Sequence, residues 1–264
     1  MYGPKERRMR RIFRSDGKTL IVAMDHAGGM GIVPGLDNPG KTIELVLAGG
    51  ADVIMTTYGV ATRFAEQIGT AGLILRVDGG TSMLAKERGS MSLIYNALDA
   101  LRIGADGVVA MGFPGSVYEA ETLPYLSLLV SECREWNLPV LAEMLPGGFE
   151  DPAHWWTPEN IGHACRIGAE LGVDFVKTQY SGDVESFRRI VDTTYVPIVV
   201  LGGGKIKTET DLLTVVYDAM QAGAKGVAIG RNIYQHPSPD KMTRAIAAII
   251  HDDATVKQAE KALR

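Results

Sequence analysis

The amino-acid sequence predicts a single-domain α/β protein, a closed (β/α)8 TIM barrel. From Leu20 onward, short apolar segments alternate with amphipathic helical segments, the pattern of βαβ units that build a parallel sheet. Eight such units fall within about 250 residues, the usual extent of this barrel. A doubly wound open sheet usually has fewer strands and a Gly-x-Gly-x-x-Gly fingerprint, which does not follow the first strand here. We assign residues 20–264 to the barrel and residues 1–19 to a basic N-terminal extension.

The eight predicted strands are apolar segments that run into polar residues or glycine. They are expected at Leu20–His26, Val53–Thr57, Leu73–Asp78, Gly107–Phe113, Val140–Leu145, Phe175–Tyr180, Ile198–Gly202 and Gly226–Gly230. In such a barrel the active site lies at the carboxyl ends of the strands, so the residues there are considered first for chemistry.

The helices between these strands have clear start and stop signals. A capping side chain precedes a first-turn proline at Asn38-Pro39, Thr157-Pro158 and Ser238-Pro239. Glycine supplies the left-handed turn that stops a helix before the next strand at Gly50-Ala51-Asp52, Gly104-Ala105-Asp106, Gly172-Val173-Asp174 and Gly223-Ala224-Lys225. One supersecondary unit therefore repeats along the chain.

Composition and charge exclude several classes of partner. The 264 residues are 46% hydrophobic and carry a net charge of -4, which gives no reason to expect nucleic acid. The extension holds seven Lys or Arg, but Met9, Ile12 and Phe13 favour a partly packed helix with a solvated face over a membrane or nucleic-acid arm. Cys133 and Cys165 fall inside predicted helices, as core thiols of a reduced protein do. With no apolar run of roughly 20 residues and no secretion signal, we expect a cytoplasmic protein without membrane contact.

The stretch from Asp174 to Asp183 places Lys177 in the middle of a short buried strand. A buried ammonium group must be either paired or used. An apolar setting lowers the pKa of a lysine, and the resulting free amine can attack a carbonyl and form a Schiff base. The alternative is a lysine that reaches a carboxylate or the strand end. We also expect Gln179, two residues further along, to bind substrate.

The first strand ends in Asp25 and His26 and runs into a glycine-rich loop over residues 27–35. Asp25 can act as a general base or hold the Lys177 ammonium, and His26 can shuttle protons near neutral pH. The alternatives are that Asp25 caps loop amides and that His26 is a hydrogen-bonded core residue. The long loop fits an element that closes over substrate.

The third strand ends in Arg76 and Asp78, which lie two residues apart and therefore point the same way. A simple ion pair between them accounts for both residues.

Glycine-rich turns follow the last two strands, at Gly202-Gly203-Gly204-Lys205 and at Gly230-Arg231-Asn232. Barrels build phosphate sites at these two places, because bare backbone N–H groups approach the oxygens and a cation adds charge. Each cluster alone is explained equally well by a tight turn. No His-x-His or His-Glu-x-x-His spacing is present, so we expect neither a metal nor a cofactor. A barrel with a lysine in the sixth strand, an aspartate at the end of the first strand, a phosphate site and no metal has the layout of an imine-forming aldolase.

These motifs resemble those of the archaeal-type class I aldolase family, also called the DhnA family. The resemblance covers essentially the whole barrel and is carried by Val22-Ala23-Met24-Asp25-His26, Val176-Lys177-Thr178-Gln179-Tyr180-Ser181-Gly182-Asp183, Gly202-Gly203-Gly204-Lys205 and Gly230-Arg231-Asn232-Ile233-Tyr234-Gln235. It implies that Lys177 forms the Schiff base, that Asp25 transfers protons, and that Gly203, Gly204, Gly230 and Arg231 contact phosphate. Members assemble as large rings, often decamers, so the resemblance also implies a homo-oligomer.

One departure from the family concerns the fifth strand. Its fructose-bisphosphate aldolases and aminodideoxyheptulosonate synthases have a Tyr-Pro pair there, whose tyrosine is the acid/base, and this chain has Leu145-Pro146. Leucine cannot move a proton. Glu143 lies on the same strand face and can serve as a protonated acid, unless it forms a buried ion pair. His26 and Tyr180 are further candidates for the missing function.

The expected activity is therefore a class I aldolase acting on a phosphorylated ketose, with dihydroxyacetone phosphate as one fragment. Two alternatives remain. One is acyl or ketose transfer through the same imine, as in the autoinducer-2 thiolase or heptulosonate synthase branches of the family. The other is a sugar-phosphate binding protein that has lost turnover.

Overall fold

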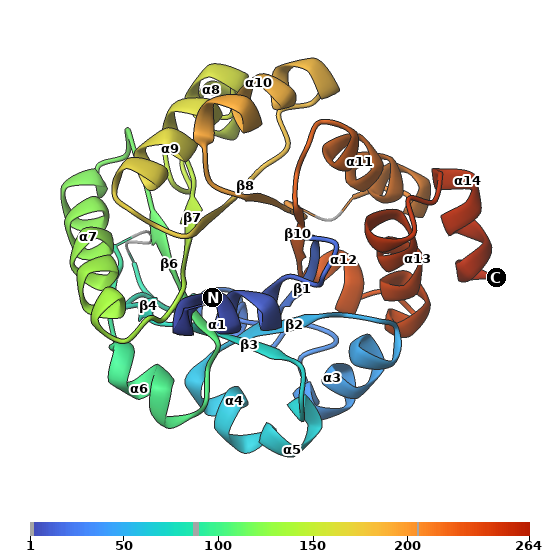
Figure 1. Ribbon diagram of the computed structural model, residues 1–264, viewed down its shortest axis with the longest axis horizontal. Helices are drawn as coiled ribbons and strands as arrows, with labels where there is room; N and C mark the ends of the chain where they lie inside the picture. Colours follow the sequence, from blue (N-terminus) through green and yellow to red (C-terminus); the bar gives the residue numbers. More distant parts are fainter. Residues whose placement is uncertain (1–2, 87–89, 205) are drawn as a thin grey trace.

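A computed structural model describes residues 3–86, 90–204 and 206–264. Eight parallel strands close a barrel in the order β1-β10-β9-β8-β7-β6-β3-β2 (Figure 1). Their bounds are β1 (Thr19–Ala23), β2 (Val53–Thr56), β3 (Gly72–Arg76), β6 (Gly107–Gly112), β7 (Val140–Met144), β8 (Phe175–Thr178), β9 (Ile198–Leu201) and β10 (Gly226–Ile229). The predicted (β/α)8 barrel is confirmed, and each strand ends one to three residues before its predicted limit. A small antiparallel pair that the sequence did not predict joins β4 (Asp78–Gly79) to β5 (Ser92–Leu93).

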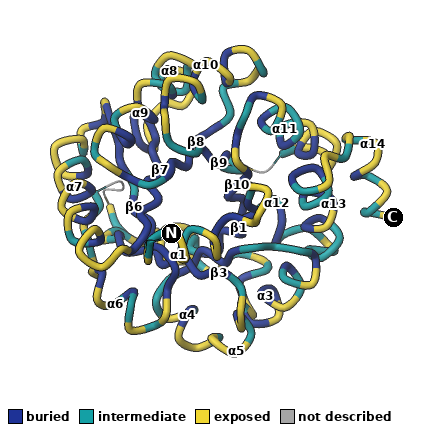
Figure 2. Tube along the Cα trace, viewed as in Figure 1, coloured by how far each residue is buried: buried dark blue, intermediate teal, exposed yellow. Residues whose placement is uncertain are grey.

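Helices surround the barrel, with their exposed faces outward and the strands buried (Figure 2). They are α1 (Pro4–Ile12), α2 (Ala27–Met30), α3 (Pro39–Ala48), α4 (Tyr58–Arg63), α5 (Ala65–Ile68), α6 (Ala97–Arg102), α7 (Glu119–Glu135), α8 (Pro152–Trp155), α9 (Pro158–Glu170), α10 (Val184–Thr194), α11 (Glu209–Gln221), α12 (Arg231–Tyr234), α13 (Pro239–His251), α14 (Val256–Ala259) and the 3-10 helix η1 (Glu260–Leu263). Asn38 and Thr157 cap α3 and α9 as predicted, whereas the side chain of Ser238 makes no capping hydrogen bond to α13. Within the described residues, no helix combines the length and the apolar character that crossing a membrane requires.

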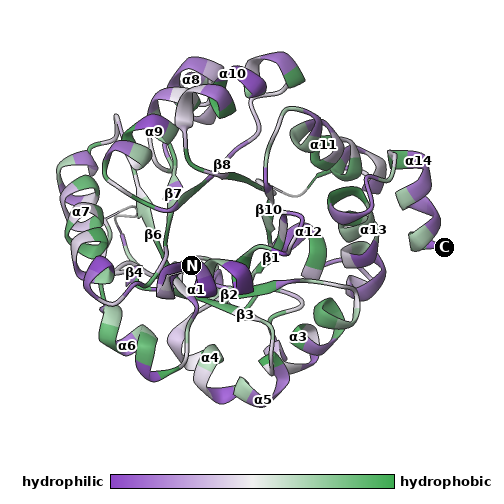
Figure 3. Ribbon diagram, viewed as in Figure 1, coloured by the Kyte–Doolittle hydropathy of each residue, from purple (hydrophilic) through white to green (hydrophobic). Residues whose placement is uncertain are grey.

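The end of α1 closes the bottom of the barrel. Ile12 and Phe13 pack against the inward-facing apolar side chains of the strands, and the Phe13 ring meets Phe175 edge to face at 5.3 Å between centroids. Figure 3 shows that the rest of α1 is largely hydrophilic. The extension therefore contributes its apolar residues to the core and leaves a polar outer face.

Basic residues of the extension are paired with the aspartates that follow the helix-stopping glycines. Lys5 lies 2.8 Å from Asp174, Arg11 lies 2.6 Å from Asp106, and Arg14 contacts Asp52. The same aspartates accept backbone N–H groups at the start of three strands, from Val140 at 2.9 Å, Leu73 at 3.0 Å and Leu20 at 2.7 Å. These contacts give the basic residues a structural role at the amino-terminal end of the barrel.

His251, at the end of α13, joins the same end of the molecule to the C-terminal helices. Its Nδ1 lies 2.7 Å from Asp16 Oδ2 and its Nε2 lies 3.0 Å from Asp52 Oδ2, and the side chain is only 6% exposed. Burial lowers the pKa of the imidazole, but the hydrogen bonds to Asp52 and Asp16 outweigh burial and raise it above its usual value. The protonated form is therefore favoured in the folded protein.

We predict that His251→Gln lowers the melting temperature near pH 6, by roughly 2–4 °C for each kcal/mol lost. A raised folded-state pKa stabilises the fold fully below the ordinary histidine pKa of about 6.5, and this contribution disappears as pH rises through the folded value. Thermal unfolding of wild type and variant at pH 6 and pH 9 measures the effect. The exposed His163 provides the control, His163→Gln. A deficit that grows toward pH 9 would contradict the assignment.

Candidate active site

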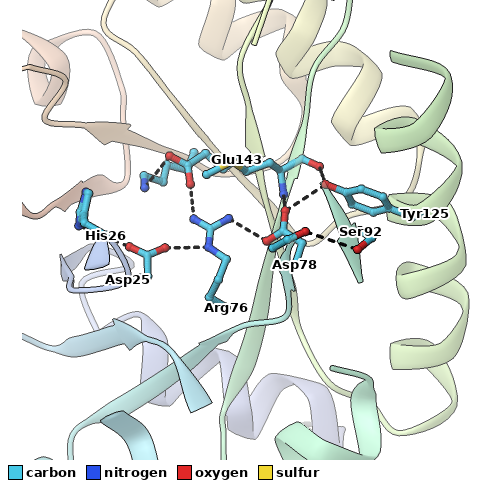
Figure 4. Close-up of polar contacts among 10 residues, drawn as sticks. Asp25, His26, Arg76, Asp78, Ser92, Tyr125 and Glu143 are labelled. Carbon is cyan, nitrogen blue, oxygen red and sulfur yellow. Dashed lines mark hydrogen bonds and ion pairs between the residues drawn. The ribbon is translucent and has the colours of Figure 1, made fainter. Parts of the chain in front are cut away.

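Five charged side chains meet at the carboxyl ends of the strands, with Arg76 at their centre (Figure 4). The guanidinium donates from Nε to Asp25 Oδ2 at 2.7 Å, from Nη1 to Asp78 Oδ1 at 3.1 Å, and from Nη2 to Glu143. All the side chains in these three pairs are at most 8% exposed. The predicted pair of Arg76 and Asp78 is confirmed, but it is one of three contacts.

Lys177 completes this cluster from β8. Its Nζ lies 2.7 Å from Glu143 Oε1, and the barrel register places the two residues side by side on β7 and β8. The expectation of an apolar setting for the ammonium is wrong, because the facing strand supplies a carboxylate. Glu143 thus bridges the two cations, with one oxygen on Lys177 and the other on Arg76.

The positive charges of Arg76 and Lys177 favour the ionised forms of Asp25 and Glu143. Burial raises the pKa of Asp25, but Arg76, His26 and Lys177 together outweigh burial and hold the pKa well below the usual range. For Glu143, burial likewise raises the pKa, while Lys177 and Arg76 lower it, and the net shift is downward. These contacts favour the alternative for Glu143, a buried ion pair, over a protonated acid.

Asp78 anchors Arg76 from the side away from Lys177. Its Oδ2 accepts the Met111 N–H at 2.7 Å and lies 3.0 Å from the Tyr125 hydroxyl, which is also 2.8 Å from the Met111 carbonyl oxygen. Tyr125 comes from α7, so this anchor ties the site to the outer layer of the barrel. Neither Tyr125 nor the threefold contact of Arg76 was predicted from the sequence, in which a pair of charges at a strand end was the signal for Arg76.

His26 lies beside the cluster. Its Nδ1 is 3.7 Å from Asp25 Oδ1, beyond hydrogen-bonding distance, and this buried nitrogen finds no partner among the described residues. The alternative of a hydrogen-bonded core histidine is therefore not supported. Burial lowers the pKa of the imidazole, which favours the neutral form.

The two glycine-rich turns are held together next to this cluster. Arg231 Nη2 donates to Gly203 O at 2.8 Å, and Asn232 Nδ2 donates to Gly202 O at 2.9 Å and to Gly204 O at 3.1 Å. Lys205, in the same motif, lies outside the described residues. Gly230 packs closely against the first strand, since a Cβ there would overlap the Ala23 carbonyl oxygen and lie 2.5 Å from His26 Cε1.

Gln179 and Tyr180 follow Lys177 and differ in their surroundings. Gln179 is 4% exposed, its Oε1 accepts from Thr178 Oγ1 at 3.1 Å, and its buried Nε2 is unpartnered among the described residues. The Tyr180 ring packs on Phe187 of α10, with 5.3 Å between centroids, so Tyr180 faces the helix layer rather than the charged cluster. Leu145 is buried and its N–H donates to Gly112 O at 2.9 Å.

The described residues contain no group of three or more His, Cys, Asp or Glu side chains arranged to hold a metal ion.

Comparisons with known proteins place the chain among aldolases. The family model described as DeoC/LacD family aldolase matches residues 19–236. An uncharacterized aldolase of Saccharolobus solfataricus is 32% identical over 269 residues, which cover 98% of both proteins. The 2-amino-3,7-dideoxy-D-threo-hept-6-ulosonate synthase of Halobacterium salinarum is 36% identical, over 97% of this chain and 94% of the relative. A solved archaeal fructose-1,6-bisphosphate aldolase, its catalytic lysine covalently bound to the carbinolamine intermediate of the substrate, is 31% identical with a TM-score of 0.84, over 93% of this chain and 99% of that one.

We predict that Gly230→Ala destabilises the protein by about 1–3 kcal/mol, the usual cost of overpacking. The new methyl group would displace either the Ala23 carbonyl or the His26 ring. Chemical denaturation followed by fluorescence measures the loss. Gly59→Ala is the matched control, because nothing lies within 4 Å of a Cβ at Gly59. Equal unfolding midpoints for the two variants would refute the close packing.

Proposed function

This chain belongs to the DeoC/LacD family of class I aldolases, and from that premise we propose that it cleaves or forms a phosphorylated ketose through a Schiff base on Lys177. The resemblance read from the sequence is thereby confirmed, and membership of the family makes the protein a carbon–carbon lyase. The observation that carries the proposal is the position of the Lys177 nitrogen, 2.7 Å from Glu143 in a buried cluster at the carboxyl ends of the strands. The lysine adduct in the related archaeal aldolase supports it.

The reaction begins when Glu143 accepts a proton from Lys177 Nζ. The free amine attacks the ketone carbon of the substrate, and loss of water from the carbinolamine leaves a protonated imine. The imine draws the electron pair of the adjacent carbon–carbon bond as a base removes the proton of the neighbouring hydroxyl group. That bond breaks to give an aldehyde and an enamine, and protonation and hydrolysis of the enamine release the ketone fragment and restore Lys177.

Two carboxylates and one imidazole are available for these proton transfers. Glu143 serves the nitrogen, because its Oε1 contacts Nζ directly. Asp25, which is kept ionised, is the base for the substrate hydroxyl, and His26 beside it passes the proton onward. In this proposal, these three groups take over the proton transfers of the family's tyrosine, whose position Leu145 occupies in this chain.

The phosphate group is assigned to the paired glycine turns. Backbone N–H groups of Gly202, Gly203, Gly204 and Gly230 surround it, Arg231 adds a positive charge, and the free amide of Gln179 binds a substrate oxygen. Dihydroxyacetone phosphate is the proposed ketone fragment, since it contains both the carbonyl group that Lys177 needs and the phosphate.

A second candidate function is transfer of a ketose or acyl fragment through the same imine. The 36% identity to the Halobacterium salinarum synthase favours it. A rate that depends on an added second substrate identifies this reaction. A homo-oligomer, which the family resemblance implies, stays a prediction, and light scattering of the purified protein tests it.

We predict that borohydride reduction with dihydroxyacetone phosphate traps an adduct on Lys177, because the reduced imine is a stable amine. Intact and peptide mass spectrometry locates it, and Lys177→Ala, which cannot form an imine, should show none. Binding of the phosphate ester without an adduct, repeated across a panel of ketose phosphates, would replace the aldolase by a sugar-phosphate binding protein.

We also predict that Arg231→Ala raises the half-saturating concentration of dihydroxyacetone phosphate in this trapping assay about 10- to 100-fold, the worth of one charge-assisted hydrogen bond. Trapping of unphosphorylated dihydroxyacetone should be nearly unchanged, because it offers Arg231 no charge. Arg188→Ala, an exposed arginine of α10, is the control. An equal loss for both ketones would remove Arg231 from the phosphate site.

A further inference from the structure

The mechanism above uses three members of the charged cluster and leaves Arg76 and Asp78 without a role. Three carboxylates surround the Arg76 guanidinium, and its side chain is 6% exposed. Burial of charge is costly unless each group is paired, and removal of one partner leaves an uncompensated charge. A cluster of this kind at the reacting nitrogen therefore requires an explanation.

The Arg76 guanidinium is held rigidly. Its planar fork points three N–H groups at three different carboxylates. On the far side, Asp78 is itself fixed by the Met111 N–H and by the Tyr125 hydroxyl. Arg76 thus stays in place when a substrate or a water molecule enters beside Lys177.

Arg76 in turn sets the positions of the two carboxylates that the mechanism uses. Asp25 and Glu143 are held on separate nitrogens of one guanidinium. Arg76 contacts Glu143 Oε2, and the other oxygen, Oε1, lies 2.7 Å from the Lys177 nitrogen. When Glu143 has accepted the lysine proton on Oε1, its Oε2 still accepts the hydrogen bond from Arg76.

We infer that Arg76 is the positioning residue of this site: it holds Asp25 and Glu143 apart and fixes Glu143 Oε1 on the Lys177 nitrogen, so that proton transfer proceeds without a tyrosine in the fifth strand. The inference rests on the proposed Schiff-base function. Arg76 acts through the two carboxylates and does not itself touch substrate.

Charge counting shows what the loss of Arg76 does. The three carboxylates and two cations carry a net formal charge of -1, and removal of Arg76 makes it -2. The groups that act on Glu143 are Lys177 of β8, Arg76 of β3 and Asp25 after β1, and His26 adjoins Asp25. Without the guanidinium, either Asp25 or Glu143 takes up a proton at a pH at which both are ionised in the wild-type protein.

The test compares Arg76→Met and Arg76→Lys with wild type in the initial rate of borohydride trapping of dihydroxyacetone phosphate from pH 4 to pH 9. We expect Arg76→Met to move the acidic limb of the profile upward by about 1–3 pH units, the effect of a lost neighbouring charge. The maximal rate should fall while the half-saturating concentration changes little. Arg76→Lys should restore part of both, since a point charge cannot reach three carboxylates. Arg63→Met, an exposed arginine of α4, is the control.

A second readout keeps this inference separate from the aldolase proposal. Carbon-13 NMR of labelled Asp and Glu carboxyl groups in the unliganded protein should show one group titrating at higher pH in Arg76→Met. This shift is expected even if wild type forms no adduct, a result that would refute only the Schiff base. An unchanged carboxyl titration with an equal loss of rate at every pH would reduce Arg76 to a structural residue.

Tyr125→Phe provides an independent test should the Arg76 variants fail to fold. It keeps every charge and removes one hydrogen bond from the anchor of Arg76. We expect a roughly 2- to 10-fold lower trapping rate, a position of the acidic limb close to that of wild type, and an unchanged half-saturating concentration. A wild-type rate in this folded variant would contradict the anchoring of Arg76.

Discussion

The ion pair between Lys177 and Glu143 is the interaction on which the charged cluster at the carboxyl-terminal end of the barrel depends. A lysine in the middle of a barrel strand costs several kcal/mol unless its charge is met. Glu143 meets it from the neighbouring strand, Arg76 meets the charge of Glu143, and Asp25 and Asp78 meet that of Arg76. Each partner buries a further charge, so the network ends only where backbone and hydroxyl groups satisfy Asp78.

The two ends of the barrel divide stability from chemistry. At the amino-terminal end, the aspartates after the helix-stopping glycines bind strand N–H groups and the basic residues of the extension, with apolar side chains above them. The carboxyl-terminal end holds the charged cluster and the glycine turns. In this fold, the amino-terminal end of the barrel usually serves stability and the carboxyl-terminal end usually holds the active site. The basic N-terminal segment therefore has a structural role within the chain.

Leu145 marks how this site differs from family members that carry a tyrosine. Leucine in place of tyrosine removes a proton donor from the fifth strand. Glu143, two residues earlier, brings a carboxylate to the Lys177 nitrogen. In the proposed mechanism, Glu143, Asp25 and His26 share the proton transfers. The buried Nδ1 of His26 and the buried Nε2 of Gln179 have no hydrogen-bond partner among the described residues.

The sequence by itself determined the barrel, the strand that carries Lys177, the glycine turns and the family, because periodicity, helix stops and short motifs are local properties of the chain. It also placed Arg76 beside Asp78. Only the tertiary structure decided the rest. Arg76 meets Asp25 and Glu143 across separations of 51 and 67 residues, and Tyr125 reaches Asp78 across 47. The tertiary structure also decides the ionisation of Glu143. Barrel register sets which side chains face one another, and the charges of those neighbours decide whether a buried carboxyl group is ionised.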